Sequence, residues 1–308
     1  MGTYVVRRLL QMIPVVIGTT FLIYTLVWFL PGDPFAGRCG QRPCPEAYVA
    51  LMTQKFNLDD PLIVSYLKYL GGVLTGNFGE TFTGLSVWSE IARAYPVTMK
   101  LAAVAIFFEI TIGISAGIMA GLRRGKFLDN LVLISTLLVI SIPVFVIGTV
   151  LQYFLGLKMG LFPPTVPPDA PIYSLILPGF VLASLSLAYV ARLVRTSLGE
   201  NVKSDYVRTA TAKGLPHRRI IGLHVMRNSL IPVITFIGAD FGALLGGAIV
   251  TEGIFNIAGV GGLTYRAIQT QDAAMVTGVV TVLVLVFLFV NLFVDLLYGV
   301  LDPRIRHE

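Results

Sequence analysis

Three acidic side chains stand inside otherwise uncharged apolar stretches of this 308-residue chain: Glu109, Asp240 and Asp295. Ionisable residues are costly in lipid, and they usually face a bundle interior or a water-filled cavity. Each one therefore marks either a polar contact between helices or a wall of a transport path. For Glu109 and Asp240 we favour a polar contact between helices or a protonated carboxyl over a place in a transport path. For Asp295 we favour a structural role. The residues open to the path interpretation are Glu109, Asp240 and Asn291.

Few other residues could perform chemistry. There is no H-E-x-x-H motif, and two Cys and three His give a metal framework little to work with. An intramembrane aspartyl protease using Asp240 and Asp295 is disfavoured, because residues 238–240 read GAD rather than the end of a G-x-G-D motif. No G-x-x-x-x-G-K-[ST] phosphate-binding loop occurs; the nearest approach, GLRRGKF at 121–127, has the wrong spacing. The sequence predicts no catalytic, cofactor or metal site.

Cys39 and Cys44 lie close together, in the segment CGQRPC. Their segment is expected to lie outside the cytoplasm, where disulfides form and persist. The sequence therefore predicts a disulfide between them, with two free thiols as the alternative, since spacing alone does not fix the geometry of the bond.

The elements that must position these residues are membrane spans. Only 13% of residues are charged, against about 25% in soluble domains, and the mean hydropathy is +0.80. Apolar stretches of about 20 residues can cross a bilayer as helices, and the sequence predicts an all-α polytopic protein with one transmembrane domain over residues 1–308. The predicted spans are 9–30, 101–121, 131–157, 172–191, 229–250 and 274–301.

The positive charges orient these spans. Fifteen of the 23 Lys and Arg residues fall at the termini and in the loops after spans 2 and 4, and many of the others lie in one long loop. Short loops rich in Lys and Arg stay in the cytoplasm, so both termini are expected there. The net charge of +6 thus reports orientation and not a nucleic-acid partner.

Two loops are long enough to fold. In the extracytoplasmic loop, 31–96, the sequence predicts a short helix at 46–56. It predicts a second helix that is capped by Asp60 and has Pro61 at its first position. The cytoplasmic loop, 192–228, holds eight basic residues. There Ser204 or Asp205 can start a helix, Gly214 can stop it, and Pro216 can start a second, basic one. Anionic lipid would explain these charges but not the start and stop signals, so protein docking and lipid contact both remain open.

These loops carry a resemblance to a known family. DYVRTATAKGL at 205–215, followed by RNSLIP at 227–232, resembles the EAA loop of bacterial ABC importer permeases, and more narrowly the dipeptide/oligopeptide permeases. Matching segments run along the whole chain. They are YVVRRL at 4–9, LPGDP at 30–34, LDDPL at 58–62, YLKYL at 66–70, GAIVTEGIFN at 247–256, GVGG at 259–262 and LDPR at 301–304. Departures from the usual family residues are Asn77, Asp205, Thr211, Ala258 and Gln271, and residues 39–44 are no family hallmark.

The resemblance implies a type I ABC importer permease of six transmembrane helices. It also implies that the helix ending at Gly214 is a coupling helix, seated in a groove of a cytoplasmic ATPase. The residues placed in this ATPase-docking helix by the resemblance are Asp205, Tyr206, Val207, Arg208, Thr209, Ala210, Ala212, Lys213, Gly214 and Leu215.

The family further implies a bacterial inner-membrane protein that imports dipeptides or short oligopeptides by alternating access. Its expected partners are two ATP-binding subunits or domains carrying ATP and Mg, a second homologous permease, an extracytoplasmic substrate-binding protein, peptide and the lipid bilayer. The chain itself is expected to bind no cofactor and to be no enzyme. The alternatives are a permease of the same class for nickel, glutathione or another small solute, and a self-contained secondary transporter, for which no internal repeats or paired broken helices are found in the sequence.

Overall fold

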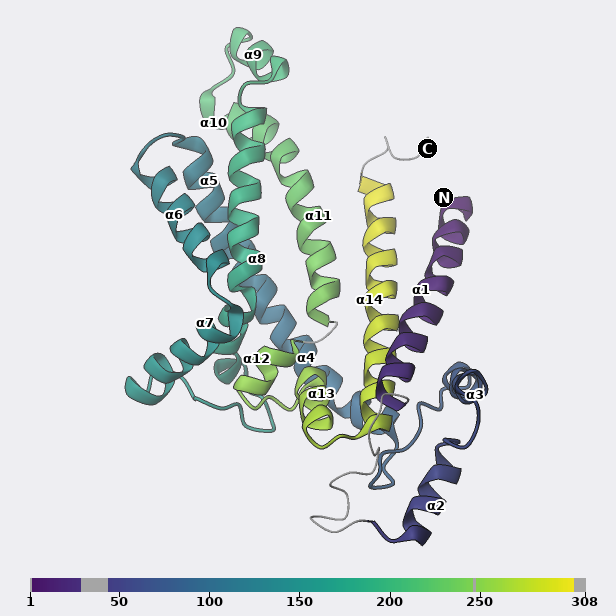
Figure 1. Cartoon of the computed structure of the whole chain (residues 1–308). Coiled ribbons are helices and arrows are strands. Elements are labelled where there is room, and N and C mark those ends of the chain that lie inside the picture. The colour runs from purple at the N-terminus through teal and green to yellow at the C-terminus, as the bar shows by residue number, and fades with distance from the viewer. Residues whose placement is uncertain (1, 29–43, 246–247, 302–308) are drawn as a thin grey trace.

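A computed structural model describes residues 2–28, 44–245 and 248–301 of the chain. Within those ranges the regular structure is helical (Figure 1), with one isolated β-bridge between Glu80 and Ser86. Five helical stretches are long and apolar enough to cross a membrane, and a bent helix pair supplies a sixth. The predicted all-α polytopic architecture is therefore confirmed.

The first half of the chain begins with one long helix and two short outer ones. α1 (Gly2–Trp28) is followed by α2 (Glu46–Lys55) and α3 (Leu62–Leu74). The second span is a continuous run of α4 (Val87–Phe108), the π-helical segment η1 (Glu109–Gly113) and α5 (Ile114–Leu122). It starts at Val87, so the end of the predicted loop 31–96 is helical.

The third span is broken, which the sequence analysis did not predict. α6 (Phe127–Ser141) and α7 (Val144–Leu151), which continues as π-helical η2 (Gln152–Lys158), meet at an angle of 100°. The break lies at Pro143, which has no N–H to donate and disfavours helical backbone at the residue before it. Ile142 is accordingly extended, with φ −102° and ψ 126°. The predicted span 131–157 is therefore not one continuous helix but a bent pair.

The second half of the chain contains two long helices joined through a small one. α8 (Ile172–Asn201) is followed by α9 (Asp205–Ala212), α10 (His217–Arg219), π-helical η3 (Ile220–Val225) and α11 (Met226–Leu245). His217–Leu245 forms one continuous stretch, so the predicted second, basic helix is the beginning of the fifth span. Most of the predicted loop 192–228 therefore belongs to long helices, and α9 stands between them at one end of the molecule (Figure 1).

The chain ends with two short helices and the sixth span. α11 ends at Leu245, short of the predicted Val250, and α12 (Ile249–Ile254) is a separate helix. α13 (Val260–Gln269) and α14 (Ala273–Leu301) follow. In Figure 1, α12, α13, α2 and α3 lie at the end of the molecule opposite α9, whereas the first turn of α1 points toward the α9 end.

Close helix packing depends on small residues. Gly113, Gly117 and Gly121 form a stripe on η1 and α5 that faces α8, where a Cβ added to Gly117 would lie 2.5 Å from the Val194 Cβ. α11 approaches α14 in the same way through Gly238 and Gly242. Such stripes let helix backbones come close in a bilayer, where van der Waals packing rather than the hydrophobic effect drives association.

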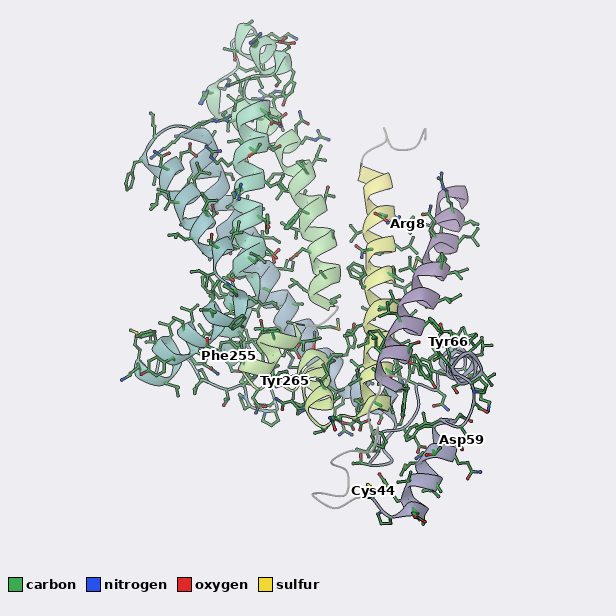
Figure 2. All side chains as sticks on the ribbon, in the orientation of Figure 1. Arg8, Cys44, Asp59, Tyr66, Phe255 and Tyr265 are labelled. Carbon is green, nitrogen blue, oxygen red and sulfur yellow. The ribbon has the colours of Figure 1, made fainter. Side chains whose placement is uncertain are left out.

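The outer helix α3 joins α1 to α14. The Tyr66 hydroxyl lies 2.9 Å from the Thr20 hydroxyl and donates to the Ile17 carbonyl on α1, while the Tyr69 hydroxyl lies 2.8 Å from the Thr281 hydroxyl on α14. Tyr66 is seen beside α1 in Figure 2. The N-cap of α3 is Pro61, so the prediction that Asp60 caps this helix was wrong.

Candidate functional site

The helix α9 has the start and the stop that the sequence predicts, with one difference at the start. Ser204 occupies the N-cap, but its hydroxyl donates to the Asn201 carbonyl at 2.5 Å instead of accepting from the helix. Asp205 lies in the first turn, where a negative charge suits the helix dipole. The backbone of α8 therefore anchors the residue from which α9 begins.

The C-terminus of α9 is closed by a Schellman motif. Gly214 has φ +73°, a left-handed conformation that glycine adopts without cost. The Gly214 N–H donates to the Thr211 carbonyl at 2.9 Å, and the Leu215 N–H donates to the Ala210 carbonyl at 3.3 Å. Both bonds satisfy carbonyls that a helix end otherwise leaves unpaired.

The ten predicted docking residues fall into two groups. Val207 and Ala210 are buried, and Leu215 packs beside them, in a small core with Leu198, Ile220 and Val225. This core fixes α9 to α8 and to η3. The other seven residues are exposed on the surface of α9 and of the turn that ends it: Asp205, Tyr206, Arg208, Thr209, Ala212, Lys213 and Gly214.

The exposed face of α9 is polar and mostly basic. The Asp205 and Arg208 side chains are 95% and 77% exposed, and their ion pair is long, at 3.4 Å. Such pairs contribute about 0–1 kcal/mol. Lys213, His217, Arg218 and Arg219 are exposed in and directly after the same turn. These exposed charges therefore contribute little to the stability of the fold and are accessible to a partner.

Among the predicted path residues, the structure brings two together. Glu109 begins η1 and is completely buried, and neither carboxylate oxygen has a hydrogen-bond partner. Asp240 of α11 is the charged group that acts on Glu109. Asn291 lies on α14, where its side-chain amide donates to the Phe287 carbonyl at 2.9 Å and faces Gly242 of α11. Whether these residues line a path stays a prediction.

Asp295 forms an ion pair between the first and last spans. Its Oδ2 lies 2.6 Å from a guanidinium nitrogen of Arg8 on α1, and Arg8 points from α1 toward α14 in Figure 2. Asp295 and Asp240 thus have different neighbours, so the dyad that an aspartyl protease would need is not assembled from them.

Sequence reasoning missed a buried network at the opposite end of the molecule. Glu252 of α12 is completely buried, and it accepts from the Thr98 hydroxyl at 2.8 Å and from the Gly262 N–H at 2.8 Å. The Thr98 hydroxyl in turn accepts from the Val260 N–H at 2.8 Å. Glu252 thereby satisfies the N-terminus of α13 and ties α12 and α13 to α4. Burial raises the pKa of Glu252, and the hydrogen bonds it accepts oppose that effect.

The signal for this network was present in the sequence, in the glycines. A Cβ on Gly259 would lie 2.3 Å from the Glu252 Oε2, and one on Gly262 would lie 2.1 Å from the Ile257 carbonyl oxygen. Three glycines within 259–262 therefore indicate a backbone that approaches other groups closely.

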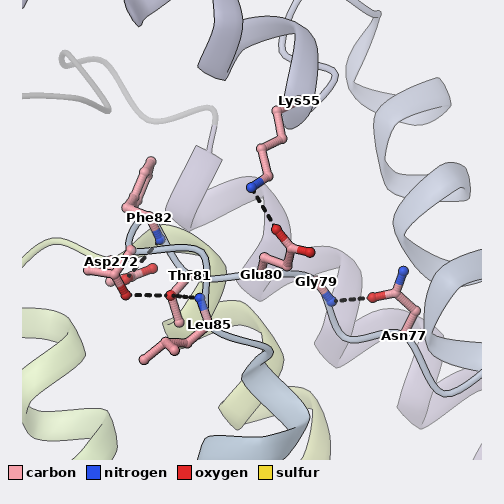
Figure 3. Close-up of polar contacts among 9 residues, drawn as sticks. Lys55, Asn77, Gly79, Glu80, Thr81, Phe82, Leu85 and Asp272 are labelled. Carbon is pink, nitrogen blue, oxygen red and sulfur yellow. Dashed lines mark hydrogen bonds and ion pairs between the residues drawn. The ribbon is translucent and has the colours of Figure 1, made fainter.

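A second polar cluster holds the turn before α4 (Figure 3). Asp272 caps α14 by accepting from the Met275 N–H at 3.1 Å, and it also accepts from the Phe82 N–H at 3.4 Å. In the same turn Glu80 pairs with Lys55 at 2.7 Å, and the Asn77 side chain accepts from the Gly79 N–H at 2.9 Å. Asn77, a departure from the family pattern, thus still closes its turn.

Two further expectations concern cysteines and metals. Cys39 lies outside the described residues, so its disulfide with Cys44 stays a prediction. Within the described part of the chain, no three His, Cys, Asp or Glu residues gather closely enough to hold a metal ion.

Comparison with known proteins identifies families and a solved structure that resemble this chain. Residues 113–307 match the family described as binding-protein-dependent transport system inner membrane component, and residues 1–102 match the corresponding N-terminal family. A solved structure titled as inward facing conformations of the MetNI methionine ABC transporter has the same fold. Its TM-score is 0.56 at 18% identity, over 69% of this chain and 96% of that chain.

Curated relatives cover the chain from end to end. The di/tripeptide transport system permease protein DppB of Pseudomonas aeruginosa (strain UCBPP-PA14) is 35% identical over 100% of both chains. The dipeptide transport system permease protein DppB of Escherichia coli (strain K12) is 34% identical over 99% of both. The protein of the same name from Bacillus subtilis (strain 168) is 37% identical over 99% of this chain and 98% of that protein. This chain belongs to the family of binding-protein-dependent transport system inner membrane components.

Proposed function

We propose that this chain is the membrane-spanning permease subunit of an ATP-driven importer that moves dipeptides or short oligopeptides into the cytoplasm by alternating access. The full-length dipeptide permease relatives support the class of substrate. The observation that carries the mechanism is α9, a capped helix that projects between two spans and keeps its charged face free.

In this proposal α9 seats on a separate ATPase. Its exposed residues, above all Arg208 and Lys213, would contact the ATPase groove. Val207, Ala210 and Leu215 would hold α9 to α8 and η3 so that its displacement reaches the spans. A loop without this core would absorb the displacement instead of passing it on.

The complete importer needs further parts. Two ATP-binding subunits or domains would supply ATP hydrolysis with Mg, a second homologous permease would complete the path, and an extracytoplasmic binding protein would deliver the peptide. The α9 end and both termini would face the cytoplasm, because most basic residues gather at that end. This chain would bind no cofactor of its own.

The path itself would pass polar groups of α11 and α14. Asp240 and Asn291 are partly buried, whereas Glu109 has no exposed surface and would reach the path only if α11 moved away. Replacing Asp240 with Asn should then alter the uptake rate while the complex still assembles. Unchanged uptake would remove Asp240 from the path.

Breaking the α9 stop tests the coupling. Gly214→Pro is incompatible with φ +73° and removes the N–H that donates to Thr211. In the reconstituted importer we expect ATP hydrolysis to continue while peptide uptake falls at least tenfold. Gly160→Pro is the matched control, because Gly160 also has a positive φ, at +64°, and a backbone hydrogen bond, but lies at the other end of the molecule. Wild-type uptake in Gly214→Pro would disprove the role of α9.

Substrate class needs a separate experiment. The chain would be purified with its co-eluting ATPases and binding protein, and labelled dipeptide, longer peptide, glutathione and nickel would be compared in proteoliposomes. We expect ATP-dependent uptake of the dipeptide. Uptake of nickel or glutathione alone would identify a different solute for an importer of the same class. The absence of any co-purifying ATPase would contradict the proposal that the chain belongs to an ATP-driven importer.

A further inference from the structure

The Glu109 and Asp240 carboxyl groups differ from the other buried carboxylates described above. Glu109 is completely buried with both oxygens unpartnered, and the Asp240 Oδ2 is buried without a partner as well. In contrast, Glu252 has two donors, and Asp295, whose Oδ2 also accepts no hydrogen bond, has an ion pair with Arg8. Glu252 thus has donors and Asp295 has a cation, whereas no hydrogen-bond donor of the described residues reaches this pair.

In the described helices around the pair, no cation compensates for its charge. Glu109 is the single charged residue of 101–121, Asp240 is the single one of 229–245, and residues 172–191 of α8, which packs against η1, contain no Asp, Glu, Lys, Arg or His. On α8 the titratable Tyr189 packs against Phe236 of α11 in a tilted arrangement, with ring centroids 6.2 Å apart. The charged residue of α14, Asp295, is already paired with Arg8.

Two ionised carboxylates in such a place would be unstable for two reasons. Each would lose its hydration without gaining a donor, and each would repel the other in a medium of low dielectric constant. Phe108 and Phe241, each next in sequence to one of the two residues, pack against the same buried cluster, and the two carboxyl groups lie close enough for a hydrogen bond to each other. Ionised carboxylates only accept hydrogen bonds, so this bond exists only if one of the two groups carries a proton.

We propose that Glu109 and Asp240 form a proton-binding site within the bilayer, where they share one proton and are joined by it. The proton removes one of the two negative charges and supplies the missing donor. It therefore makes a repulsive contact between η1 and α11 into an attractive one. This inference does not rest on the proposed coupling through α9.

Infrared spectroscopy can detect the shared proton directly. The permease, purified with its partner subunits and placed in lipid nanodiscs at about pH 7, should show the C=O stretch of a protonated carboxyl, with a shift after exchange into D2O. Glu109→Gln should abolish this signal, since glutamine keeps the size and a donor but has no carboxyl. Asp240→Asn should shift or abolish it, because the hydrogen-bond partner changes.

Asp295→Asn is the matched control. It removes another carboxylate of the spans, one that is ion-paired with Arg8 and lies outside the Glu109–Asp240 pair, so it should leave the signal unchanged. If Glu109→Gln does not assemble, Asp240→Asn and the wild-type spectrum decide the question. The proposal is overturned if the wild type shows no protonated carboxyl at about pH 7, or if the signal survives unshifted in both variants of the pair. Either result leaves peptide uptake, and hence the proposed function, untouched.

Discussion

Glu252 accepts hydrogen bonds on both of its carboxylate oxygens, one from Thr98 and one from the backbone of Gly262. A glutamine in its place would turn an NH2 group toward a donor, and an aspartate would be too short to reach both. Because Thr98 also accepts from Val260, a change at Glu252 disturbs the hydrogen bonds of both Val260 and Gly262 at the start of α13. The type of this one residue is thus set by two donors from two separate segments.

Glu252→Gln should therefore destabilise the purified permease by about 1–3 kcal/mol, the usual cost of leaving a buried polar group unsatisfied. Thermal unfolding in detergent would measure the effect. Glu80→Gln is the control at the same end of the molecule. The Glu80 side chain is 52% exposed and its pair with Lys55 lies at the surface, so its loss should cost about 0–1 kcal/mol. Equal stabilities of the two variants would show that the Glu252 network contributes nothing special.

At the scale of elements, the contact between α5 and α8 depends on the absence of side chains. A Cβ added to Gly117 would lie 2.5 Å from the Val194 Cβ and 2.6 Å from the Ala191 carbonyl oxygen. The carbonyl belongs to the backbone of α8 and cannot turn away, so the two helices would have to separate.

Gly117→Ala should lower the stability by about 1–3 kcal/mol, as overpacking does in other tightly packed cores. Gly18→Ala is the control, because Gly18 also lies inside a spanning helix but has nothing within 4 Å of an added Cβ. Melting temperatures of both purified variants would be compared. A Gly117→Ala protein as stable as Gly18→Ala would mean that α5 and α8 can adjust at no cost.

Several elements were predictable from local signals. The start and stop of α9 follow from Asp205 and Gly214, and α2 follows from Pro45 and the residues after it. The break at Pro143 was signalled by the proline, but prolines at 14, 96, 178 and 232 lie inside continuous helices. Which proline breaks a span is decided by tertiary packing, and one sequence does not reveal that.

The network around Glu252 and the pairing of Glu109 with Asp240 were harder to predict. Each joins segments more than 100 residues apart, and hydropathy reports burial without reporting neighbours. The sequence could mark Glu109 and Asp240 as unusual, but only the fold shows that they meet. Glu252 was quoted in a motif without a role, because its partner Thr98 is an ordinary threonine of a spanning helix.

At the scale of the whole molecule, α1 joins the bundle from its edge. It packs against α14 through the pair of Arg8 with Asp295, and α3 links the same two helices through Tyr66 and Tyr69. The first and last spans thus form one unit that is fastened at two levels.

Arg8→Ala should weaken this unit, since it leaves Asp295 without its cation. The cost should reach up to about 3 kcal/mol, the value for an aspartate at the centre of a span. The double variant Arg8→Asp with Asp295→Arg should recover much of the loss, because the pair is restored with opposite polarity. Yields of folded, membrane-extracted protein by size-exclusion chromatography would show this. A double variant no better than the single one would mean that the pair itself does not matter.

The long helices on either side of α9 have a mechanical consequence. α8 is an unbroken helix of 30 residues, which corresponds to a rod of about 45 Å at 1.5 Å per residue. A rotation of this rod by about 5° about one end would displace the other end by about 4 Å, roughly three quarters of the helical pitch of about 5.4 Å. Because α9 is fixed to α8 and to the helix that continues into α11, one small push would swing two stiff rods together. Leverage, rather than any large rearrangement of α9 itself, would then set how far the opposite end opens.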